Sequence, residues 1–167
     1  MNKILIVEDE KNIRESIQTV LSENYEIRAI DNAEDAIKLF ADENFDLLIS
    51  DIKLPGMDGI ELVKKFKEIY PASPVIVITA FSNVKNAVEA MKAGANEYIP
   101  KPFSLDELVI KVENLLKIQQ LSNEREYYQQ ERERYFGEII GESPEIIEVK
   151  EKIKKNCRER CNCFNYR

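Results

Sequence analysis

Acidic side chains follow two of the short apolar runs of this 167-residue chain. Glu8 and Asp9 come directly after the run Ile4–Val7, and Asp51 closely follows the run Leu47–Ile49. Carboxylates brought together in one cleft repel one another unless a cation is present. Hard oxygen ligands without Cys or His favour Mg²⁺, which accepts a few carboxylates and keeps several waters. The residue types therefore predict a magnesium site.

Phosphoryl transfer is the chemistry that these residues could perform. Asp51 could act as a nucleophile and form an aspartyl phosphate, a reaction that needs mainly positioning and charge neutralisation. Thr79, after the run Val75–Ile78, would donate its hydroxyl, and Lys101 would neutralise a phosphoryl oxygen. The competing interpretation of each residue alone is structural: Thr79 as an ordinary threonine at the end of a strand, and Lys101 as a solvated lysine in a loop. Pro102 suggests a cis Lys101–Pro102 bond.

Helix capping is the competing interpretation of the acidic residues. For Glu10, capping or plain solvent exposure is favoured over a functional role. For Asp9 and Asp51 the functional interpretation is favoured, because both follow strands that are expected to be buried.

Five apolar runs rich in Ile and Val alternate with segments of helical period over residues 1–117. The runs are expected to be buried strands: Ile4–Val7, Ile27–Ile30, Leu47–Ile49, Val75–Ile78 and Tyr98–Ile99. Strict alternation predicts an α/β fold, a doubly wound five-stranded parallel sheet with helices on both faces. The helical segment after the fourth run is expected to bury an apolar face: Val84, Ala87, Val88 and Met91. Ligands of such folds bind at the carboxyl ends of the strands.

Composition excludes several classes of protein. The chain has no His, which excludes His-based catalysis and His–metal sites within it, and no apolar run approaches a membrane span. The N-terminus lacks the layout of a signal peptide, so a cytoplasmic protein that does not associate with a membrane is expected. The net charge of −7 lies entirely in residues 1–117, which argues against nucleic-acid binding by that part.

Four segments carry a specific resemblance: ILIVEDE, DLLISDIKLPGMDGIEL, VIVITAF and AMKAGANEYIPKPF. They resemble the receiver domain of two-component response regulators over residues 1–118. The resemblance implies a flavodoxin- or CheY-like sheet of strand order 2-1-3-4-5. It also implies that Asp51 is the phosphoacceptor, that Asp9 binds Mg²⁺ directly, that Glu8 binds it through water, and that the Lys53 carbonyl is a further ligand.

The resemblance assigns three more residues and a partner. Thr79 and Tyr98 match the switch pair, and Lys101 matches the lysine of the receiver site. The alternative for Tyr98 is a half-buried aromatic residue in an edge strand. The implied phosphoryl donor is a phosphohistidine on a separate sensor histidine kinase. Phosphorylation would then change the surface formed by the fourth helix, the fifth strand and the fifth helix.

The helical pattern continues beyond Leu116 to Gly137, and residues 119–137 are expected to form a helical linker. Apolar and arginine residues recur at spacings of three and four: Ile118, Leu121, Arg125, Tyr128, Arg132 and Tyr135. This imperfect heptad seam favours a homodimeric coiled coil over a solvated single helix, because so polar a helix gains little stability alone.

Residues 138–155 resemble the opening of the AAA+ ATPase domain of NtrC-type activators of sigma-54 RNA polymerase. No Walker A motif follows, so no turnover ATPase is expected in this chain. Residues 156–167 contain all three cysteines but too few ligands for a zinc site. With suitable codons, a one-base frameshift converts them to an apolar strand, so a frameshifted or disordered tail is the hypothesis that the coding DNA tests.

The sequence therefore predicts a phosphorylatable regulatory receiver of an NtrC-type transcription activator, whose full-length form would contact sigma-54 RNA polymerase and DNA. Two alternatives stay open: a flavodoxin-like redox or nucleotide-binding domain, and an interaction scaffold that never takes phosphate. The first would require a Ser/Thr/Gly-rich phosphate loop after the first strand, where this chain has Glu8-Asp9-Glu10.

Overall fold

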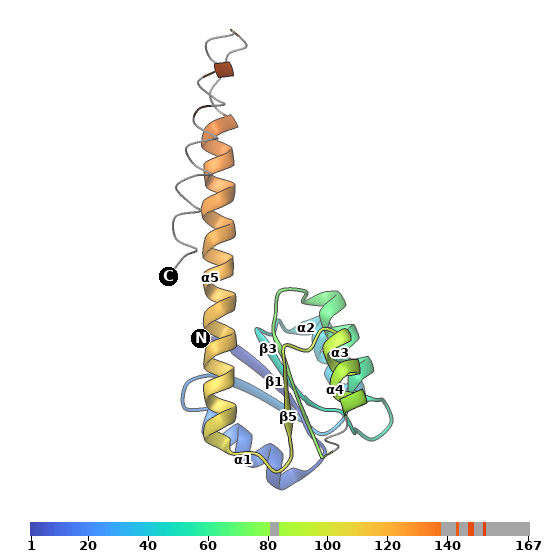
Figure 1. Cartoon of the computed structure of the whole chain (residues 1–167). Coiled ribbons are helices and arrows are strands. Elements are labelled where there is room, and N and C mark those ends of the chain that lie inside the picture. Colours follow the sequence, from blue (N-terminus) through green and yellow to red (C-terminus); the bar gives the residue numbers. More distant parts are fainter. Residues whose placement is uncertain (81–83, 138–142, 144–146, 149–151, 153–167) are drawn as a thin grey trace. The chain divides into compact units, whose positions relative to one another are not determined.

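The computed structural model describes residues 1–80, 84–137, 143, 147, 148 and 152 (Figure 1). The chain divides into two compact units, Met1–Leu121 and Ser122–Arg167, which are described separately. No helix in the described part of the chain combines the length and the hydropathy that crossing a bilayer requires.

A five-stranded parallel sheet forms the centre of the first unit. Its strands in chain order are β1 (Lys3–Val7), β2 (Glu26–Ile30), β3 (Leu47–Asp51), β4 (Val75–Thr79) and β5 (Glu97–Pro100). The spatial order is β2-β1-β3-β4-β5, and every neighbouring pair is parallel. The predicted fold class and strand order are confirmed.

Five helices complete the described elements. They are α1 (Lys11–Leu21), α2 (Ala33–Asp42), α3 (Gly59–Ile69), α4 (Val84–Lys92) and α5 (Leu105–Gly137). Side chains of a strand alternate between the two faces of a sheet. Ile4 of β1 therefore belongs to a core with Ile17 of α1 and Val112 of α5, whereas Leu5 belongs to the opposite core with Phe66 of α3.

Burial on both faces explains why the central strands β1, β3 and β4 are continuous apolar runs. The expectation of a buried strand at Ile27–Ile30 is wrong, because β2 lies at the edge of the sheet and none of its residues is fully buried. Every residue of β3 and β4 is buried, including Asp51 and Thr79 at their carboxyl ends. Full burial of an Ile or Val side chain contributes about 1.5–3 kcal/mol, so these central strands anchor the fold. The polar ends of the same strands are thereby held in a rigid frame.

The predicted apolar face of α4 is wrong. Val88 and Met91 are 45% and 49% exposed, whereas Ala90 is fully buried against the sheet and Ala87 is half-buried. Small alanine side chains allow a helix backbone to approach its neighbours closely, and the larger side chains then lie outside the contact. The side chain of Val84 lies outside the described residues.

The second unit contains the part of α5 that runs from Ser122 to Gly137. Its described side chains are exposed, apart from a partly buried Glu131, and the rings of Tyr127 and Tyr128 meet edge to face at 5.9 Å. Of the expected ATPase opening at 138–155, the structure describes only residues 143, 147, 148 and 152. The expected tail at 156–167 lies outside the described residues.

Candidate functional site

Three carboxylates meet at the carboxyl edge of the sheet. Oxygens of Glu8, Asp9 and Asp51 all lie within 4.8 Å of one another. Their convergence follows from the register of the sheet. Val7 of β1 lies opposite Ser50 of β3, and the residues that follow them, Glu8 and Asp51, are both acidic. Glu8 and Asp51 are buried, and Asp9 is exposed. The structure thus brings together the three acidic residues that the sequence singled out.

Lys101 lies among these carboxylates. Its Nζ is 2.7 Å from Asp51 Oδ2, 2.8 Å from Glu8 Oε1 and 3.1 Å from Glu10 Oε1, and only 9% of its side chain is exposed. The Lys101 backbone N–H donates to the carbonyl of Thr79 at 2.7 Å, which fixes this segment to the end of β4. The Lys101–Pro102 peptide bond is cis, as predicted.

The local field perturbs two of these groups. Burial alone would lower the pKa of Lys101, but hydrogen bonds to Asp51 and Glu8 raise this pKa above its ordinary value. Burial raises the pKa of Glu8, although the Lys101 ammonium acts against this shift. Within the described part of the chain, the buried Glu8 Oε2 has no hydrogen-bond partner. An orphaned carboxylate oxygen in an acidic cluster suits a cation.

The loop after β3 completes the rim of the site. The Lys53 backbone N–H donates to Asp51 Oδ1 at 2.9 Å, so each oxygen of Asp51 has a fixed partner. A cleft of about 710 Å³ runs past Asp9 and Lys53 toward Asn86 and Glu89 on α4. Sequence reasoning missed Asn86 and Glu89, and nothing in their spacing distinguishes them from ordinary helix-surface residues.

Thr79 and Tyr98 lie on the same face of the sheet. Thr79 is fully buried at the end of β4, one residue beyond Ile78, which pairs with Asp51. Tyr98 lies opposite Val77, two residues before Thr79 on the same side of β4, and its half-buried ring packs against the core. Burial raises the pKa of the Tyr98 hydroxyl.

Three residues have contacts that the sequence did not indicate. Glu10 precedes α1 without making a side-chain capping bond, and its exposed carboxylate pairs with Lys101 instead. Arg14 donates to main-chain carbonyls of the loop between β1 and α1. Gly59, at the start of α3, lies so close to Asp51 that an added Cβ would be 2.0 Å from the Asp51 carbonyl oxygen. A Gly after Asp58, which caps this helix, was the available signal.

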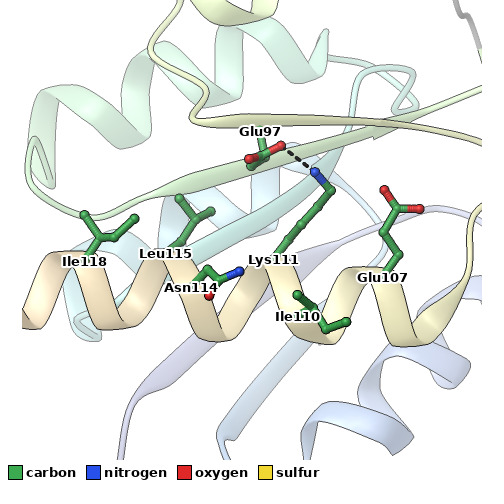
Figure 2. Close-up of a pocket in the computed structure, with 7 residues that line it drawn as sticks. All are labelled: Glu97, Glu107, Ile110, Lys111, Asn114, Leu115 and Ile118. Atoms are coloured by element: carbon green, nitrogen blue, oxygen red, sulfur yellow. Dashed lines mark hydrogen bonds and ion pairs between the residues drawn. The ribbon is translucent and has the colours of Figure 1, made fainter. Parts of the chain in front are cut away.

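A second surface lies on β5 and α5, away from the cluster of Glu8, Asp9 and Asp51. Figure 2 shows a groove of about 570 Å³ in which Glu97 of β5 and Lys111 of α5 point toward each other and form an ion pair of 2.8 Å. Ile110 and Ile118, which also line the groove, are 57% and 60% exposed. Large apolar side chains are therefore accessible on this face.

The five-stranded parallel sheet, with a buried aspartate, an acidic pair and a lysine at its carboxyl edge, has the receiver fold. The sequence model of the response regulator receiver domain matches residues 4–113. The chain belongs to the response regulator receiver family, as its motifs predicted.

Curated relatives extend the similarity beyond the receiver itself. The chain is 36% identical over 152 residues to the regulatory protein AtoC of Escherichia coli, covering 89% of this chain and 33% of AtoC. It is 37% identical over 150 residues to the DNA-binding transcriptional regulator NtrC of Proteus hauseri, covering 87% of this chain and 31% of NtrC. The predicted relationship to NtrC-type regulators is confirmed, and the chain spans about a third of the length of these relatives.

Solved structures show the same fold. A CheY-like receiver domain protein from Methanospirillum hungatei superposes with a TM-score of 0.71 at 33% identity, covering 73% of this chain and 98% of that one. The receiver domain of the Francisella response regulator 1452 gives 0.65 at 34% identity, covering 70% and 98%.

Proposed function

We propose that Asp51 accepts a phosphoryl group from a phosphohistidine of a sensor histidine kinase. An Asp51 carboxylate oxygen attacks phosphorus, the P–N bond breaks, and its electron pair remains on the imidazole of the donor. The observation that supports this most strongly is a buried carboxylate that is ion-paired at one oxygen with Lys101 and hydrogen-bonded at the other to the Lys53 amide. Lys101 is placed to neutralise a phosphoryl oxygen.

Mg²⁺ is the cofactor that this donor set fits. Carboxylates of Glu8, Asp9 and Asp51 with the Lys53 carbonyl would hold it, and the orphaned Glu8 Oε2 supports this assignment. When bound, the ion supplies charge neutralisation among the carboxylates and the phosphoryl oxygens. The chain's own residues orient the acceptor and exclude water from it.

Thr79 and Tyr98 are proposed to couple the phosphate to the surface. Thr79 would move its hydroxyl toward the phosphoryl group, and the Tyr98 ring would rotate into the space beside it. Their common face of the sheet supports the proposal, because a change at Thr79 would then reach the neighbouring strand β5 on the face that carries Tyr98.

The changed surface is proposed to form a homodimer. The exposed apolar residues on α4 and α5, together with the Glu97–Lys111 pair, provide a mixed apolar and charged face for a second copy. The linker seam would extend the contact as a coiled coil, since its described apolar residues Ile118, Leu121 and Tyr128 are exposed. Sedimentation with and without a phosphoryl mimic tests whether phosphorylation changes the association.

The role of the whole protein is proposed from the family. The chain would be a cytoplasmic regulatory module that phosphorylates itself once rather than a turnover enzyme. The full-length protein would contact sigma-54 RNA polymerase and DNA, as the relationship to the NtrC-type regulators supports.

Intact-mass measurement tests the central step. The protein is incubated with acetyl phosphate, with Mg²⁺ or with a chelator. We expect an acid-labile adduct of one phosphoryl group that requires the cation and is absent from Asp51→Asn. Asp31→Asn, at an exposed position after β2, is the matched control and keeps the adduct. An adduct of unchanged size in Asp51→Asn contradicts the proposal.

A further inference from the structure

Arg14 folds back from α1 onto the loop that carries the acidic pair. Its Nη1 donates to the main-chain carbonyl of Glu8 at 2.5 Å and to that of Asp9 at 3.2 Å. Its own backbone N–H donates to the carbonyl of Glu10 at 3.0 Å, so the residue belongs to the first turn of the helix. One guanidinium nitrogen thus holds two successive carbonyls.

These two carbonyls belong to the peptide groups before and after the Asp9 Cα, which contain the Asp9 and Glu10 backbone nitrogens. The loop between β1 and α1 has only three residues, and the Glu8 N–H is fixed to the Ile30 carbonyl at 3.1 Å. Holding both peptide planes fixes the direction in which the exposed Asp9 side chain leaves the backbone. An arginine suits this task, because its guanidinium is always charged and its donors are held in a rigid plane.

We propose that Arg14 is a positioning residue, which holds the Asp9 carboxylate beside Glu8 and Asp51 and thereby strengthens Mg²⁺ binding. The proposal rests on the proposed magnesium site. Residues that orient metal ligands contribute substantially, and their loss typically weakens metal affinity about 10- to 100-fold. Because Arg14 acts through the main chain of the loop, we expect an effect at the lower end of that range.

Simple electrostatics predicts the opposite sign. A cationic side chain near a cation site repels the incoming ion, so removal of its charge alone would tighten Mg²⁺ binding. Positioning and charge are therefore separated by the direction of the change and not only by its size. Arg14→Lys separates them again, since lysine keeps the charge but has no planar donor group.

The experiment is a titration of the full chain with Mg²⁺, followed by amide chemical shifts around Asp51. We expect Arg14→Ala to weaken Mg²⁺ binding about tenfold, and Arg14→Lys to lie between Arg14→Ala and the wild type. Arg28→Ala is the charge-matched control, because Arg28 on β2 is paired with Glu43 and touches none of the carboxylates of the site. This control is expected to bind Mg²⁺ as the wild type does.

Unchanged or tighter binding by Arg14→Ala overturns the inference. If Arg14→Ala does not fold, Arg14→Lys decides, because positioning predicts weaker binding than wild type and charge alone predicts equal binding. A wild-type protein that shows no Mg²⁺-dependent shifts contradicts the proposed function itself. Wild-type binding with no change in either Arg14 variant contradicts only the role of Arg14.

Discussion

Replacement of Lys101 by Met removes one cation from three carboxylates at once. Glu8 and Asp51, whose side chains are 2% and 6% exposed, would then be charged without a counterion. Removing one partner of a buried ion pair costs about 3–5 kcal/mol, because the other charge stays buried. We expect Lys101→Met to lower the free energy of unfolding of the metal-free protein by this amount at pH 8.

Urea unfolding in a chelating buffer measures this loss, and Lys111→Met is the matched control. Lys111 also forms a 2.8 Å pair, with Glu97, but the two side chains are 26% and 36% exposed. An exposed pair contributes about 0–1 kcal/mol. The Glu97–Lys111 pair is only partly buried, so the control is expected to lose much less than Lys101→Met. Both substitutions exchange the same side chains, so the comparison separates a buried lysine among three carboxylates from a partly exposed lysine paired with Glu97.

Magnesium and pH should both reduce the deficit of Lys101→Met. Mg²⁺ that binds only the folded state stabilises both proteins, by about 2.7 kcal/mol at 100 times the dissociation constant. Loss of the competing ammonium makes the variant bind the ion more tightly than the wild type, and this difference reduces the deficit. Burial raises the pKa of Glu8 and the Lys101 ammonium opposes this shift, so in the variant Glu8 takes up a proton more readily and the deficit shrinks as the pH falls. In the wild type, the pKa of Lys101 is higher in the folded protein than its ordinary value of 10.5. The contribution of Lys101 to the free energy of unfolding is therefore complete below pH 10.5, and it is lost only as the pH rises through the folded-state pKa. Equal losses for both variants, or a deficit unaffected by Mg²⁺, would refute the reasoning.

Three further predictions concern packing and the acid limb of stability. Gly59→Ala should move the Asp51 backbone and slow phosphorylation by acetyl phosphate at least about tenfold, since near-attack geometry is lost by shifts of about 1 Å; an unchanged rate contradicts this. Tyr70→Phe should cost about 1–2 kcal/mol in urea unfolding without changing phosphorylation, because the hydroxyl is within hydrogen-bonding distance of the carbonyls of Phe40 and Glu43 at 3.0 and 2.8 Å. Lys3 and Arg28 lower the pKa of Glu43, so its contribution is present above 4.5 and lost as the pH falls through its folded pKa; the difference between wild type and Glu43→Gln should therefore vanish in acid, and a constant difference would contradict the assignment.

The strands and their order follow closely from the sequence. Runs such as Val75–Ile78 are apolar on both faces, which only a strand covered by helices on both sides can satisfy. The site edge follows in turn, because parallel strands place their ends together. This is why Glu8, Asp51 and Lys101 meet although they are far apart in the chain.

Other features depend on tertiary contacts that a pattern does not contain. The nine residues of α4 are too few for the sequence to decide whether the face with Val88 or the face with Ala90 is buried. The helix lies close to the sheet, and the smaller side chain, Ala90, is the one that fits there. The reach of Arg14 back to two carbonyls depends on where a long side chain folds. The approach of Gly59 to Asp51 depends on the path of the intervening loop. The magnesium ligands, the switch pair and the dimer stay predictions.

Identification of the modified residue tests the central claim most directly. The protein is phosphorylated with acetyl phosphate and Mg²⁺, reduced with borohydride to convert an aspartyl phosphate to homoserine, and digested for peptide mass spectrometry. Our account predicts homoserine at position 51 and unmodified aspartate at Asp9 and Asp58. Homoserine at another aspartate with position 51 intact would contradict the account.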